Sequence, residues 1–152
     1  RIPTLVDADT VVTETRAVCR YLESVGDGTK IFAYSGDWPA EQLENAAMSF
    51  LDGCALWTRE YRRPEDKQFD GLCDVERDRA ERGLDWFNAH PDIQSLNSPW
   101  DFAHIVLAVA IEYMDFRALI TDWREGHDAL VTWHNAQMQR PSMQANPMVP
   151  GA

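Results

Sequence analysis

Two short runs that are rich in apolar residues occupy the first thirteen positions, and a helical repeat follows them. Residues 2–6 and 10–13 are predicted to be short strands, and the polar residues 7–9 between them favour a turn. Apolar positions at helical spacing start near residue 14, and the glycines at 26–28 end that helix. A two-stranded hairpin with one helix cannot bury its apolar face alone. We therefore expect it to belong to a larger sheet and to pack on the helices that follow.

The remainder of the chain keeps a helical period. A long helix is predicted over residues 39–63, with one apolar stripe and a second apolar face that includes Met48 and Leu51. Two apolar faces imply burial on two sides, against the bundle and against either a partner or a ligand. A second, more charged helix is predicted over residues 65–90, where Pro91 ends it.

A strong helix-start signal follows in the second half of the chain. Ser98 can cap the N–H groups of the next turn, Pro99 fits the first helical position, and Asp101 can reach back as the third helical residue. The helix that it opens is apolar on nearly all sides, which is typical of the centre of a bundle. A further helix over about 125–139 and a short turn from Arg140 complete the pattern. We assign Ser98 and Asp101 a structural capping role.

Composition and charge narrow the classes of function. Hydrophobic residues make up 45% of the chain, which is enough for a packed core. Acidic residues outnumber basic ones 25 to 14, which argues against nucleic acids and anionic membranes, because both require clustered Lys and Arg. The most apolar stretch, residues 102–111, is far shorter than the ~20 residues that span a bilayer.

The cysteines and histidines give no sign of a metal site or a disulfide framework. Cys19, Cys54 and Cys73 form no C-x-x-C pair, and the histidines lack the spacing of metal ligands. We expect each cysteine to behave as a small buried hydrophobic residue in a reducing cytoplasm. His104 is flanked by apolar residues, which favours a core histidine over a catalytic one.

The order of four motifs resembles the glutathione S-transferase superfamily, and bacterial members most closely. Each motif is common alone, but their order and spacing together cover almost the whole chain. They are Ile2-Pro3, similar to the family's proline-containing turn; Glu14-Thr15, similar to its acidic–hydroxyl pair; Ser98-x-x-Asp101, similar to its capping box; and Trp123 to Met143, similar to its C-terminal helices.

The resemblance implies an α+β fold that is mostly α. Residues 1–30 would be the C-terminal part of a thioredoxin-like glutathione-binding domain, and residues 38–152 would form the all-helical C-terminal domain. The Tyr, Ser or Cys that activates the thiol in this family would lie upstream of Arg1.

The resemblance also implies a glutathione-binding role for four residues. Ile2 and Pro3 would meet the peptide backbone of glutathione, as an added strand does. Glu14 would accept the γ-glutamyl ammonium, and Thr15 would hold the γ-glutamyl carboxylate at a helix N-terminus. From the residues alone, plain helix initiation is the favoured interpretation of Glu14 and Thr15, and the resemblance shifts it to the ligand role. Thr15 stands where the family more often has Ser.

A pocket for an apolar co-substrate would need aromatic or aliphatic walls. Trp57 and Tyr61, near the end of the helix predicted over 39–63, are the candidates for this pocket, with a core role as the alternative.

The function implied is that of a cytoplasmic, homodimeric glutathione S-transferase that conjugates the glutathione thiolate to an apolar electrophile, with glutathione as substrate and no metal. A non-catalytic binding or scaffold protein of the same fold is the alternative. An independent helical interaction domain without a glutathione link is a third hypothesis.

Overall fold

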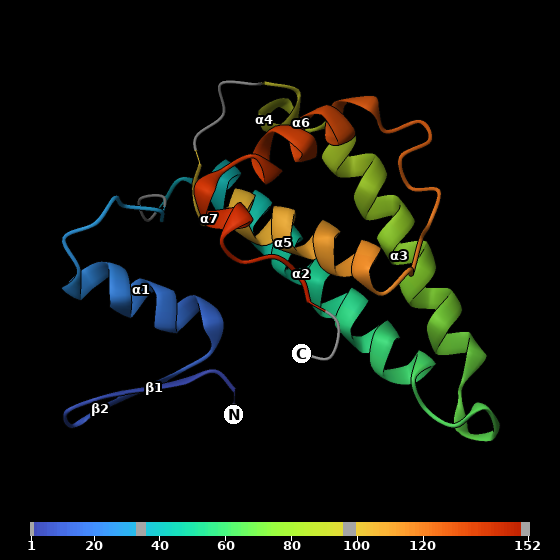
Figure 1. Cartoon of the computed structure of the whole chain (residues 1–152), viewed down its shortest axis with the longest axis horizontal. Helices are drawn as coiled ribbons and strands as arrows, with labels where there is room; N and C mark the ends of the chain where they lie inside the picture. The colour runs from blue at the N-terminus through green and yellow to red at the C-terminus, as the bar shows by residue number, and fades with distance from the viewer. Residues whose placement is uncertain (1, 33–35, 96–99, 150–152) are drawn as a thin grey trace.

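The computed structural model describes residues 2–32, 36–95 and 100–149. The chain begins with a two-stranded antiparallel sheet, in which β1 (Thr4–Asp7) pairs with β2 (Thr10–Thr13). Helix α1 (Thr15–Val25) follows directly and packs on β2. Figure 1 shows the hairpin and α1, in blue, to one side of the other helices. The hairpin and helix predicted for this segment are confirmed.

A helical bundle makes up the rest of the described chain. Helix α5 packs most extensively on α2, and α3 also packs on α2 (Figure 1). The elements of the bundle are α2 (Trp38–Tyr61), the 3₁₀ turn η1 (Glu65–Lys67), α3 (Asp70–Ala89), α4 (Pro91–Gln94), α5 (Phe102–Phe116), α6 (Asp128–Met138) and α7 (Pro141–Gln144).

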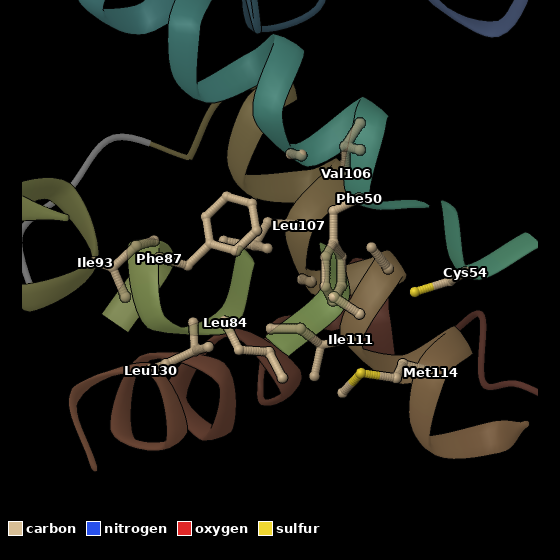
Figure 2. Close-up of a cluster of buried hydrophobic side chains, with 14 of the residues drawn as sticks. Phe50, Cys54, Leu84, Phe87, Ile93, Val106, Leu107, Ile111, Met114 and Leu130 are labelled. Atoms are coloured by element: carbon tan, nitrogen blue, oxygen red, sulfur yellow. The ribbon is translucent and has the colours of Figure 1, made fainter. Parts of the chain in front are cut away.

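The core of the bundle is formed where α2, α3, α5 and α6 meet. Leu107 and Ile111 of α5 are fully buried, and Leu84 of α3 and Leu130 of α6 close over them (Figure 2). The prediction that the nearly all-apolar helix occupies the centre of the bundle is confirmed.

The single helix predicted over residues 65–90 is wrong at its start. The structure has the short η1 turn there, and α3 begins only at Asp70. The Glu60 carboxylate accepts the Phe69 N–H at 2.8 Å, and the Gln68 side chain donates to the Tyr61 carbonyl at 3.0 Å. These side chains provide hydrogen-bond partners for backbone groups in a turn. The turn therefore forms here in place of a continuous helix.

The start of α5 also differs from the prediction. Asp101 is itself the N-cap residue, and the helix begins at Phe102 rather than at Pro99. One Asp101 oxygen accepts the His104 N–H at 3.1 Å and lies 2.6 Å from His104 Nδ1. Ser98 and Pro99 lie outside the described residues. Asp101 therefore caps the helix from one position before it, not from within its first turn.

The Asp101–His104 contact also explains the buried histidine. Burial alone would raise the pKa of Asp101, but the hydrogen bonds from His104 outweigh it and hold that pKa below its usual value. His104 is almost completely buried, with its ring near Trp133. This matches the expectation of a core histidine.

We predict that Asp101→Ala lowers the free energy of unfolding by about 1–2 kcal/mol, because the helix loses its cap. Asp101→Asn should lose less, since Asn is also a good N-cap residue. Urea unfolding of the three proteins measures this. Equal stability of the alanine variant and the parent would contradict the capping role.

A second buried histidine makes the fold sensitive to acid. His134 of α6 is only 3% exposed, and its Nε2 lies 3.2 Å from the Glu112 carboxylate of α5. Burial lowers the pKa of His134 to about 4, with Asp115 acting in the opposite direction. Burial raises the pKa of Glu112, as does the nearby Asp115. The ring is therefore neutral in the folded protein at neutral pH.

A histidine with a depressed folded-state pKa contributes stability above its ordinary value of about 6.5, and this stability is lost as the pH falls towards 4. We predict that His134 accounts for a fall of about 2 kcal/mol in unfolding free energy between pH 7 and pH 5. The raised pKa of Glu112 acts in the opposite sense, so the test compares the parent with His134→Gln. The same pH dependence in both proteins would contradict the assignment.

Candidate functional site

A cleft of about 550 Å³ opens between the N-terminal segment and the bundle. Its lining comes from the start of the chain, the first turns of α1, one face of α2 and one face of α5. These four parts are far apart in the sequence, so the cleft exists only in the folded protein.

All four residues predicted to bind glutathione line this cleft. Ile2 and Pro3 enter it from the start of the chain, and Glu14 and Thr15 enter it from the start of α1. The Ile2–Pro3 peptide bond is cis. The structure therefore brings these residues together although about ten positions separate the two pairs in the sequence.

The backbone at Glu14 is strained. Glu14 immediately precedes α1 and has φ 77° and ψ 133°. Residues other than glycine rarely adopt this backbone conformation. Such residues cluster at functional sites, where the surrounding structure imposes the conformation. The Glu14 carboxylate makes no capping hydrogen bond to the N–H groups of α1. The Glu14 side chain therefore does not act as a hydrogen-bonding cap of α1.

Thr15 occupies the first position of α1 and is exposed. The first N–H groups of a helix lack partners within the helix, and its N-terminus carries a partial positive charge. Because this end of α1 faces the cleft, it presents a site for an anionic group next to the Glu14 carboxylate.

An ion pair and an aromatic contact hold this segment against the bundle. Arg16 of α1 forms an ion pair with Glu44 of α2, and Glu44 is only 3% exposed. Burial raises the pKa of Glu44, and the charges of Arg16 and Arg20 act against that effect. Farther along, the Phe32 ring stacks on Phe102 at the start of α5, with 4.5 Å between ring centroids.

The wall of the cleft on the bundle side is mostly apolar. Met48 and Leu51 of α2 line it, together with Ile105, Val106 and Val109 of α5. The second apolar face predicted for the helix over 39–63 thus faces the cleft, which favours the ligand over the partner among the two alternatives left open by the sequence.

The two aromatic residues predicted for a co-substrate pocket are not in the cleft. Trp57 is 4% exposed in the core, where the Arg77 guanidinium lies 5.5 Å from its ring centroid. Tyr61 is 62% exposed at the end of α2. Trp57 belongs to the face of α2 that meets the core, whereas the cleft receives a different face of the same helix.

Sequence reasoning missed three polar or reactive residues of the lining. Cys19 enters it from α1, and Asp52 and Arg59 enter it from α2. Burial raises the pKa of the Cys19 thiol, so it stays protonated at neutral pH. The signal that could have found the α2 pair is their helical spacing from Met48, which places all three on one face.

A second hollow of about 310 Å³ lies between α2 and α3. It contains none of the predicted site residues, and the buried Glu76 carboxylate in it is bound by the Arg79 guanidinium at 2.8 Å. The negative charge of Glu76 is therefore already balanced by Arg79 within the protein.

The described residues contain neither a metal-binding cluster nor a helix that could span a membrane. Among residues 2–32, 36–95 and 100–149, no cluster of three or more His, Cys, Asp or Glu side chains could hold a metal ion. Within the same ranges, no helix has the length and apolar character needed to cross a membrane.

Comparison with known proteins identifies the family. Neither protein-family models nor curated proteins give a significant match. Among solved structures, a glutathione transferase family member from Pseudomonas fluorescens Pf-5 is 32% identical, with a TM-score of 0.88; the match covers 98% of this chain and 78% of that one. That protein was crystallised with S-(propanoic acid)-glutathione, and a second crystal structure described in the same words holds glutathione. The chain belongs to the glutathione transferase family.

A more distant structure agrees on the fold. A glutathione S-transferase from Methylobacillus flagellatus KT, solved with glutathione bound, is 22% identical with a TM-score of 0.83 over 98% of this chain and 76% of that one. The fold class predicted from the sequence is confirmed: a small thioredoxin-like part is followed by a helical domain.

The strain at Glu14 can be measured. We predict that Glu14→Gly is more stable than Glu14→Ala by about 1 kcal/mol, because glycine adopts a positive φ without steric cost. Both variants lose the carboxylate, so their comparison isolates the backbone term. Equal midpoints in urea unfolding would show that the positive φ is not maintained in solution.

Proposed function

We propose that the cleft binds glutathione, with the γ-glutamyl end at Glu14 and Thr15. The observation that carries this proposal is the convergence of four family-motif residues, Ile2, Pro3, Glu14 and Thr15, in one cleft. The 32%-identical relative crystallised with glutathione supports the same ligand.

The charges of the ligand match those of the site. The γ-glutamyl ammonium faces the Glu14 carboxylate, and the γ-glutamyl carboxylate accepts hydrogen bonds from the Thr15 hydroxyl and the N–H groups at the start of α1. Ile2 offers its backbone to the cysteinyl unit, as one strand does to another. Local groups thus bind an acidic peptide in a protein whose net charge of −11 would otherwise repel it.

We further propose that the protein conjugates glutathione to an apolar electrophile. The thiol loses its proton to solvent, the thiolate sulfur forms a bond to the electrophilic carbon, and the leaving group departs with the electron pair of the broken bond. The apolar wall of Met48, Leu51 and Val106 is suited to hold the electrophile beside the sulfur. No residue of this chain is assigned to activation of the thiol.

A non-catalytic glutathione-binding protein of the same fold is the second candidate. As far as the structure describes the cleft, Thr15 supplies its one hydroxyl group, and the thiol of Cys19 has a raised pKa. Retained glutathione binding without turnover of any electrophile would favour this candidate.

A homodimer in the cytoplasm completes the proposal. The hollow between α2 and α3, which Ala46 and the half-exposed Trp86 line, is the surface that we propose for contact with a second copy. Light scattering at micromolar concentration measures the oligomeric state, and a monomer would count against it.

We predict that Glu14→Gln and Thr15→Ala each weaken glutathione binding roughly ten- to hundredfold. The reason is the loss of a charge-assisted hydrogen bond worth about 1.5–3 kcal/mol. Isothermal titration calorimetry measures the dissociation constants, and Glu81→Gln, an exposed change on α3, is the matched control. If both variants bind glutathione as tightly as the parent, Glu14 and Thr15 only initiate α1 and do not bind the ligand.

A further inference from the structure

One positive charge stands at the end of the cleft away from Glu14 and Thr15. The pairing of Arg16 with Glu44 fixes the start of α1 beside the second turn of α2. Arg59 follows fifteen residues later on α2, and its Nε reaches back to the Ala55 carbonyl, so the guanidinium lies roughly 17 Å from Glu44 along the helix axis at 1.5 Å per residue. Arg59 nevertheless lines the same cleft.

The distance along α2 exceeds the length of the proposed peptide ligand. A fully extended tripeptide spans roughly 11 Å, and the γ-linkage lengthens glutathione by only two carbon–carbon bonds. A glutathione molecule anchored at Glu14 and Thr15 therefore leaves the part of the cleft beside Arg59 to a second chemical group.

Arg59 has no acidic partner within the part of the chain that the structure describes. Its Nε donates to the Ala55 carbonyl at 3.3 Å, which turns the guanidinium back along α2. Other basic side chains, such as Arg63 and Arg79, form ion pairs with neighbouring acids. The acid of the described cleft lining on the same helix face, Asp52, lies two turns earlier on α2. The guanidinium thus keeps its capacity to bind an anion.

Apart from the acidic Asp52 of α2, the surface between the two polar ends is apolar. Leu51 of α2 and Ile105 and Val109 of α5 line it. A group that fills this part of the cleft is therefore apolar along its length and can carry a negative charge only at its far end.

We propose that Arg59 is a specificity-determining residue that binds a carboxylate on the electrophilic co-substrate. The co-substrate class is an electrophile with an apolar body and a terminal carboxylate, which the planar guanidinium binds through two parallel N–H···O hydrogen bonds. This inference rests on the proposed glutathione function and adds a substrate class to it.

The test uses two isosteric probes that need no turnover, S-(4-carboxybenzyl)glutathione and S-(4-carbamoylbenzyl)glutathione, with unmodified glutathione as a third ligand. Dissociation constants are measured by calorimetry for the parent, Arg59→Gln, Arg59→Lys and the control Arg62→Gln, an exposed neighbour outside the cleft lining.

The parent should bind the carboxylate probe about tenfold more tightly than the amide probe. Arg59→Gln should abolish this preference without changing the affinity for the amide probe or for glutathione. Arg59→Lys should restore part of the preference, and Arg62→Gln should retain all of it. Circular dichroism of each variant checks that it is folded.

Three outcomes would overturn the inference in distinguishable ways. Equal affinity of the parent for the two probes would show that no carboxylate is recognised. A loss of glutathione affinity in Arg59→Gln as large as the loss for the carboxylate probe would place Arg59 at the glycine carboxylate of glutathione instead. Failure of the parent to bind glutathione at all would overturn the proposed function, and this inference with it.

Discussion

The position of α1 against the bundle determines whether the cleft exists. The hairpin and α1 bury little apolar surface of their own, and Val18 is the buried residue of α1. The ion pair between Arg16 and the buried Glu44 therefore has a large influence, because removing one partner of such a pair leaves the other charge without compensation. The contact between Phe32 and Phe102 supports the same arrangement from the other end of the segment.

This anchoring has a chemical consequence at the start of α1. It directs the helix N-terminus and the strained Glu14 backbone towards the apolar faces of α2 and α5. The helix N-terminus, the Glu14 carboxylate and an apolar wall then line one cleft. The first two suit the carboxylate and the ammonium of a zwitterionic thiol peptide, and the wall suits an apolar electrophile. The same helices, α2 and α5, bury their opposite faces in the core, so site and core are built on one rigid pair.

The sequence predicts the helical bundle well because its signals are local and strong. The nearly all-apolar run of α5 and the helix-compatible Pro39 after Asp37 each specify one outcome. The predictions were less accurate where side chains compete for the backbone, as Glu60 and Gln68 do before α3, and as Asp101 does at the start of α5.

The candidate site was predictable only in part. Glu14, Thr15, Ile2 and Pro3 form motifs whose order carries information, so a resemblance could identify them. Trp57 was misplaced because helical periodicity shows that a helix has two apolar faces but not which face meets a cleft. Helical spacing places Arg59 on the same face of α2 as Met48, but it does not show that this face meets a cleft, because the cleft exists only where α1 lies against α2.

The central claim is that the space between α1, α2 and α5 is the glutathione site. The most direct measurement is a titration of the ¹⁵N-labelled protein with glutathione, followed by amide chemical shifts, which detect even millimolar binding. We predict the largest shift changes at Thr15 and Arg16, smaller ones at Met48 and Phe102, and none in α3 or α6. Shift changes confined to the hollow between α2 and α3, or no changes at saturating glutathione, would contradict it.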